Sequence, residues 1–275
     1  TIKVSELEVI TRIQDKKEAL QPDELAVLLN PPAGLLDNDE ENARQLLALC
    51  CLCSCRFSDL KSILRKPIHM IKGLSITYPA IYLLQQKGRK GKVHKKVILP
   101  LMHHAYQILS GERPKEMRNK ALNKYASQAA KKLGLDRIQH VVDHKVLGDP
   151  IESEIPLWEV LTSHGGRRTF VTLTARKLLI ARQVVASVTG HSVPDAASDN
   201  AYLSDSPEET GETFLQQAHL RAHLMPFQVL PDVVTAQLDA MQAQAQARIR
   251  VLINRSAGQH WMHIQRAFEK ARAGA

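Results

Sequence analysis

The chain alternates short apolar runs with polar breaks, and most runs have the three-to-four-residue spacing of an amphipathic helix. The clearest helical stripe lies in residues 39–55. Its apolar positions are Leu46, Leu47, Leu49, Cys50 and Cys53. The pattern also predicts a charged helix over residues 3–20, a helix from Pro22 to a break at residues 30–34, and a helix that reaches Leu64.

Extended runs of β-branched and aromatic residues occur in one region. Residues 76–84 and 97–101 are such runs, and a basic, glycine-containing segment, residues 87–92, joins them as the tip of a hairpin. From Met102 onward the pattern predicts helices with short breaks. The sequence therefore predicts a mainly α fold with one small antiparallel β-sheet (α+β).

Composition makes this an ordinary globular chain. It has 275 residues, of which 44% are hydrophobic and 24% charged, which suits one large domain or two modest ones. No apolar run approaches the roughly 20 residues that span a bilayer, so no membrane partner is expected.

All four cysteines lie close together, as Cys50, Cys51, Cys53 and Cys55. A zinc site would need a second set of ligands at a suitable spacing, which this cluster lacks. We therefore favour small buried thiols on a helix in a reducing cytoplasm over a metal site.

The positive charge is concentrated in one stretch. Residues 56–135 hold 18 basic and 3 acidic side chains, whereas residues 1–55 hold 5 and 10, and residues 136–275 hold 14 and 15. This excess cannot be neutralised by local ion pairs and favours a nucleic-acid backbone as partner. Aromatic residues make up only 4% of the chain, which favours duplex DNA over a stacked single strand.

Four short motifs follow one another along the chain. Arg56 follows the apolar helix, His164 and Arg167 form a His-x-x-Arg box, His191 stands in a Gly-His-Ser box, and Tyr202 follows 11 residues later. In this order and spacing they resemble the catalytic domain of the tyrosine recombinase (phage integrase) family. The resemblance covers about residues 20–210 and implies that family's catalytic-domain fold.

The resemblance implies site-specific DNA recombination, integration or excision, through a 3′-phosphotyrosyl intermediate formed by Tyr202. Arg56, Arg167 and His191 would donate hydrogen bonds to the scissile phosphate, because a guanidinium presents a rigid fork of donors. His164 would assist as base for the tyrosine hydroxyl. This chemistry requires no metal, ATP or other cofactor.

The family also uses a hairpin lysine as general acid for the leaving 5′ oxygen. Counting forward from residues 82–86 leads to Lys87, whereas counting backward from Leu99 leads to Lys92. We take Lys87 first, with Lys92 and then Lys90 as alternatives. The expected DNA contacts are Lys90, Lys92, Lys95 and Arg168.

The chain departs from the family pattern at two positions. Gly166 stands where the family usually has an apolar residue, and Asn200 stands where it usually has the nucleophile. Taken singly, the motif residues also have structural explanations, such as a surface arginine for Arg56 or a core position for Tyr202. We expect Asp59 to orient one of the arginines.

The resemblance also divides the chain. Residues 1–20 would be a leader or linker from an N-terminal DNA-binding domain, residues 21–225 the catalytic domain, and residues 226–275 a C-terminal helical tail for protomer exchange. The expected partners are double-stranded DNA and further copies of the chain, as a tetramer on paired sites. The expected location is the cytoplasm, at the nucleoid of a prokaryotic or phage-infected host.

Three other functions stay open at this stage. A type IB topoisomerase or telomere resolvase shares the residues but not the assembly. A catalytically silent protein on the same scaffold would bind duplex DNA without cutting it. The third alternative is an unrelated basic helical module with chance motif matches.

Overall fold

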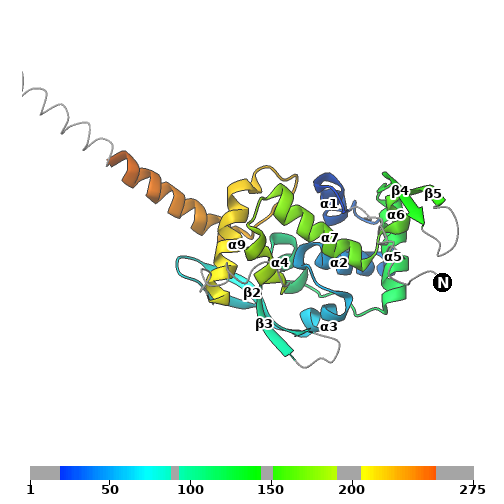
Figure 1. Ribbon diagram of the computed structural model, residues 1–275, viewed down its shortest axis with the longest axis horizontal. Coiled ribbons are helices and arrows are strands. Elements are labelled where there is room, and N and C mark those ends of the chain that lie inside the picture. The colour runs from blue at the N-terminus through cyan, green and yellow to red at the C-terminus, as the bar shows by residue number, and fades with distance from the viewer. Residues whose placement is uncertain (1–18, 88–92, 144–150, 191–205, 252–275) are drawn as a thin grey trace, which may run out of the picture. The chain divides into compact units, whose positions relative to one another are not determined.

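A computed structural model describes residues 19–87, 93–143, 151–190 and 206–251 of the chain (Figure 1). The chain divides into two units, residues 1–231 and 232–275. The described residues of the second unit form one helix, 232–251. Within the described residues, no helix is both long enough and apolar enough to cross a membrane.

The first unit combines helices with two small antiparallel sheets. Its described helices are α1 (Pro22–Leu29), α2 (Asn38–Cys53), α3 (Phe57–Arg65), α4 (His103–Ser110), α5 (Asn119–Lys132), α6 (Leu157–Val160), α7 (Ser163–Thr172), the π-helix η2 (Leu173–Lys177), α8 (Arg182–Thr189) and α9 (Pro207–Ala222). Its described strands are β1 (His69–Lys72), β2 (Thr77–Lys87), β3 (Val93–Pro100), β4 (Ile138–Asp143) and β5 (Ile151–Pro156).

Helix α2 is the centre of the core. Helices α1, α3, α4, α5 and α7 all pack against it (Figure 1). Every residue from Leu46 to Cys53 is buried, so the second half of α2 is enclosed on all sides rather than along one stripe. Asp37 caps its start, accepting a hydrogen bond from the main-chain N–H of Glu40 at 2.9 Å.

The larger sheet has the strand order β1-β2-β3. Helices α8 and α9 pack against β3. The Tyr78 hydroxyl of β2 donates to the main-chain oxygen of Glu208 at 2.6 Å, and the buried Glu212 carboxylate accepts from the Ser75 N–H at 3.1 Å. These bonds fix the start of α9 to the sheet.

The prediction that only helices follow Met102 is wrong. Strands β4 and β5 pair with each other in an antiparallel sheet, with Ile138 opposite Pro156 and Asp143 opposite Ile151. Within residues 151–155 the charged Glu152 and Glu154 alternate with the uncharged Ile151, Ser153 and Ile155, which is the two-residue period of a strand. The nearby glycine and prolines concealed this period, because they were interpreted as a helix break.

The coarse fold class, a mainly α fold with a small antiparallel β-sheet (α+β), is confirmed. Helix α2 ends two residues earlier than expected, because Ser54 adopts a left-handed backbone with φ 49°. Strand β1 was not predicted: Ile71 is its one buried residue, so its sequence carries no alternation. The helix expected over residues 3–20 lies mostly outside the described residues.

The boundary between the units lies six residues later than the sequence analysis places it. Residues 226–231 belong to the first unit, where the His103 N–H donates to the main-chain oxygen of Val229 at 3.0 Å. The Phe227 ring also packs edge-on against His104, with ring centres 6.4 Å apart. This segment is therefore tied to the start of α4.

Helices α2 and α7 cross very closely at Gly166. A Cβ atom at Gly166 would lie 2.6 Å from Cys50 Cβ and 3.2 Å from the main chain of Cys50 and Cys51. Only a residue without a side chain fits there. The glycine that departs from the family pattern is thus explained by the contact of α7 with the central helix.

We expect Gly166→Ala to destabilise the fold by about 1–3 kcal/mol or more, because the added methyl overpacks the crossing. The measurement is the free energy of unfolding in denaturant. Gly165→Ala is the matched control, since its Cβ would meet only Leu161 Cδ1 at 3.7 Å and Thr162 Oγ1 at 3.9 Å. Equal losses in the two variants would contradict the close crossing.

Candidate functional site

Arg167 lies on the buried side of α7, where that helix crosses α2. Its side chain is 7% exposed, and Nη1 donates to the main-chain oxygen of Ser54 at 2.8 Å. Burial is the main cause that lowers its pKa, followed by the positive charge of Arg56, while Asp59 acts in the opposite direction. The Ser54 carbonyl thus holds the Arg167 guanidinium in place, within electrostatic reach of Arg56.

Arg56 begins helix α3 as its N-cap residue, and its side chain is exposed. Asp59 was expected to orient an arginine side chain. Its carboxylate instead accepts a hydrogen bond from the main-chain N–H of Arg56 at 3.1 Å. Asp59 therefore caps α3, and its influence on Arg167 is that of a nearby negative charge.

His164 stands in the first turn of α7, one turn before Arg167, and is exposed. Partial burial lowers its pKa, and the positive charges of Arg168, Arg167 and Arg56 lower it further. The three arginines therefore lie within electrostatic reach of the histidine. The structure thus brings Arg56, His164, Arg167 and Arg168 into one electropositive cluster, which we call the arginine cluster.

A hollow of about 240 Å³ opens beside the arginine cluster. His164 and Arg168 supply its charged or titratable side chains, and the end of α6 supplies apolar ones. Its walls are Leu157, Val160, Leu161, Thr162, His164, Gly165 and Arg168. A phosphate group placed here would face Arg168, whose guanidinium is well suited to a phosphate oxygen.

The remaining motif residues are described in part or not at all. Lys87 ends strand β2 opposite Val93, and Lys95 lies in β3 opposite Gln85, but their side chains are not described. Lys90, Lys92, His191 and Tyr202 lie outside the described residues. Gly190 is described, and with φ 67° it ends α8 immediately before His191. The choice among Lys87, Lys90 and Lys92 stays open.

Three further cations lie beside the arginine cluster. The charge count of the sequence analysis included them but did not identify them as a group. Arg118 is the N-cap of α5, and Lys120 and Lys124 follow on that helix; all three are exposed. No carboxylate of the described residues pairs with them. Lys120 and Lys124 are four residues apart, which places them on one helix face and could have flagged them.

Hydrogen bonds join this face of α5 to the start of α7. Ser163, which precedes His164, donates from its hydroxyl to Asn119 Oδ1 at 3.2 Å and from its N–H to Asn123 Oδ1 at 3.0 Å. Arg118 also lines a hollow of about 300 Å³ together with Phe57 and Ser58, which follow Arg56. The starts of α3, α5 and α7 therefore lie together.

The cysteine cluster lies at the crossing of α2 with α7, the helix that carries Arg167. All four thiols are free and buried, and Cys50 contacts Gly166. The prediction of buried thiols on a helix is confirmed for Cys50, Cys51 and Cys53, whereas Cys55 lies past the end of α2. Burial raises the pKa of the Cys51 and Cys53 thiols, so they are neutral packing groups of the core.

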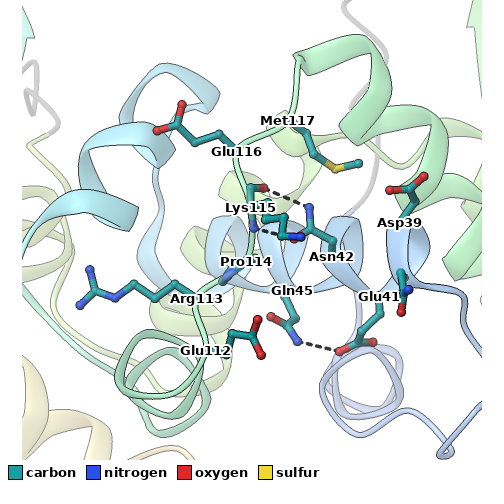
Figure 2. Close-up of a pocket in the computed structure, with 11 residues that line it drawn as sticks. Asp39, Glu41, Asn42, Gln45, Glu112, Arg113, Pro114, Lys115, Glu116 and Met117 are labelled. Carbon is teal, nitrogen blue, oxygen red and sulfur yellow. Dashed lines mark hydrogen bonds between the residues drawn. The ribbon is translucent and has the colours of Figure 1, made fainter.

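A larger hollow, about 610 Å³, lies elsewhere, between the first half of α2 and residues 112–117 (Figure 2). Several of its polar groups bind each other. Asn42 and Lys115 exchange two hydrogen bonds, of 3.0 and 2.6 Å, and Gln45 donates to Glu41 at 2.8 Å. The Arg113 guanidinium donates instead to the main-chain oxygens of Leu109, Leu64 and Lys66. The Asn42–Lys115 bonds fasten the segment to α2, and the Arg113 bonds fasten it to the ends of α3 and α4.

Comparison with family models, with curated proteins and with solved structures finds no match to this chain. The functional argument therefore depends on the chain's own residues.

We expect Arg168→Ala to raise the pKa of His164, because it removes the positive charge that disfavours the imidazolium most. The measurement is an NMR pH titration of the His164 ring. In the parent protein, His164 lowers the free energy of unfolding as the pH falls below the ordinary histidine pKa of about 6.5. The reason is that the unfolded chain binds this proton more tightly than the folded protein does.

Arg176→Ala is the control, because that exposed cation of η2 is not among the charges that act on His164. A His164 titration midpoint that stays in place in the Arg168 variant would contradict the cluster.

Proposed function

We propose that this protein is a site-specific DNA recombinase of the tyrosine type, with the catalytic-domain fold of that family. The observation that carries the proposal is the convergence of Arg56, His164 and Arg167 from two distant parts of the chain. In the proposed reaction, four motif side chains would either bind the phosphate oxygens or deprotonate the nucleophile. These three are among them, and His191 is the fourth. Chance matches would have no reason to meet in space.

In the proposed reaction the Tyr202 oxygen attacks phosphorus and the bond from phosphorus to the 5′ oxygen breaks. The tyrosine proton passes to a base, His164, and a hairpin lysine, Lys87 in our first choice, supplies a proton to the leaving oxygen. Arg56, Arg167 and His191 hold the non-bridging oxygens as negative charge develops. The phosphotyrosyl ester conserves the bond energy, so rejoining needs no ATP.

The low pKa of His164 suits the role of base. Because partial burial and three arginines disfavour its protonated form, the ring is neutral near pH 7 and has an acceptor nitrogen. The same arginines would be partly neutralised by a bound phosphate.

A catalytically silent DNA-binding protein is the second candidate. One observation favours it: the described members of the cluster are side chains suited to binding a phosphate, and none of them is a nucleophile. A type IB topoisomerase or telomere resolvase would share the cleavage step. Assembly as a tetramer on paired sites would separate a recombinase from those enzymes.

The first test uses duplexes that carry a nick in one strand near the cleavage site, so that the released fragment diffuses away and the enzyme stays attached. The duplexes come from the junctions of the source element or from a random pool. We expect a covalent adduct at Tyr202, mapped by mass spectrometry after denaturation. Arg167→Ala and Tyr202→Phe should abolish the adduct, because they remove a phosphate donor and the nucleophile.

Val171→Ala serves as the matched variant on α7, because Val171 is an exposed residue outside the hollow and Arg167 is kept. Specific binding without any adduct would overturn the enzyme and leave the silent binder. An adduct on another residue would overturn the assignment of Tyr202.

The cations of α5 predict a second, independent property. Affinity for DNA falls with salt concentration, and each phosphate contact makes the plot of log affinity against log salt concentration steeper by about 0.9. The combined variant Arg118→Gln, Lys120→Gln, Lys124→Gln should lower that slope by about 0.9 for each contact that is lost. Fluorescence anisotropy with a mixed-sequence duplex measures it.

Lys132→Gln is the control on the same helix, because Glu40 already neutralises Lys132 at 2.6 Å. A slope that falls equally in the control would remove the face of α5 from the DNA surface.

A further inference from the structure

The turn that ends α2 has an unusual backbone. Ser54 has φ 49° and ψ 25°, in the left-handed region. Ser54 and Leu179 are the two residues other than glycine with positive φ in the described part of the chain. A residue with a Cβ atom adopts this conformation only at a cost, so the surrounding structure must hold Ser54 there.

This turn is close to two of the three arginines of the arginine cluster. The main-chain oxygen of Ser54 accepts the hydrogen bond from Arg167 Nη1 at 2.8 Å. Arg56 follows two residues later and begins α3. The direction of the Ser54 carbonyl depends on the ψ angle of Ser54. The left-handed turn therefore sets where Arg167 is held relative to Arg56.

The hydroxyl of Ser54 takes no part in this arrangement. Ser54 is 1% exposed, and its Oγ has no hydrogen-bond partner among the described residues. A buried hydroxyl without a partner is unfavourable. The main chain of this residue, and not its side chain, contacts the arginine.

We propose that Ser54 is a positioning residue, whose left-handed main chain orients the Arg167 guanidinium against Arg56. The inference rests on the proposed function in one respect: the two arginines are taken to grip the scissile phosphate. The turn would then set the spacing of the two phosphate donors.

Three substitutions separate the main chain from the hydroxyl. Ser54→Gly removes the hydroxyl and makes the left-handed turn easier. Ser54→Ala removes the hydroxyl and leaves the cost of the turn. Ser54→Thr keeps the hydroxyl, but its branched Cβ disfavours positive φ.

The readout is the rate of covalent attachment to the nicked duplex at saturating DNA. We expect Ser54→Gly and Ser54→Ala to stay within about twofold of the parent, and Ser54→Thr to fall about tenfold, as a displaced turn would cause. The opposite order, with Thr retained and Gly and Ala reduced, would overturn the proposal. Equal rates in all three variants would overturn it as well.

A second readout does not require cleavage. Arginine labelled with ¹⁵N gives an NMR signal from the Arg167 side chain, identified by its loss in Arg167→Ala. Ser54→Gly and Ser54→Ala should leave this signal in place, and Ser54→Thr should shift it. If Ser54→Thr does not fold, an Arg167 signal displaced in Ser54→Gly would still overturn the proposal.

The two readouts also separate the two proposals. A parent protein that binds DNA but forms no adduct would overturn the recombinase, whereas the Arg167 signal would still decide the role of Ser54.

Discussion

The close crossing of α7 over α2 at Gly166 is the contact on which the candidate site depends. Without a Cβ at this position, α7 lies directly against the main chain of Cys50 and Cys51. The residue after Gly166 is then near enough to the end of α2 for its guanidinium to reach the Ser54 carbonyl. The last carbonyls of a helix lack intrahelical partners. Here a carbonyl just past the buried end of α2 finds its partner in Arg167.

The arrangement leaves an electrostatic imbalance at the surface. Arg167 is buried, and the nearby positive charge of Arg56 lowers the pKa of Arg167 further. Asp59 offsets part of this repulsion, but its carboxylate is already used by the Arg56 N–H. With Arg168 and His164 alongside, the cluster has more positive than negative groups around it. Anion binding would relieve this repulsion, which is why we interpret the cluster as a phosphate site.

Periodicity made the helices around the core predictable, because α1, α2 and α3 have clear apolar spacing. It failed for β4 and β5, which are short and lie beside glycine and prolines, and for β1, which buries only Ile71. These strands depend on backbone pairing with a neighbour, and a single-sequence pattern does not contain that information.

For the site, motif order identified Arg56, His164 and Arg167, and the structure brings them together. Motif order did not indicate that Asp59 would bind the main chain of Arg56. That outcome depends on where α3 begins. The face formed by Arg118, Lys120 and Lys124 was also missed, because charge totals do not show which cations have partners. Only the folded arrangement distinguishes Lys132, paired with Glu40, from Lys124, which has no carboxylate partner among the described residues.

The fold also fixes the described residues on either side of the segment that carries His191 and Tyr202. At one end, Gly190 closes α8 in a left-handed conformation. At the other, Ser206 caps α9, accepting from the Glu209 N–H at 3.2 Å, and Tyr78 holds the Glu208 main chain. Helices α8 and α9 pack on each other and on β3, the strand that pairs with β2 and Lys87. The two ends of the segment are therefore anchored to the sheet whose hairpin would supply the general acid. In the proposed reaction, the position of the sheet against α7 would therefore decide whether tyrosine, lysine and arginines meet at one phosphate.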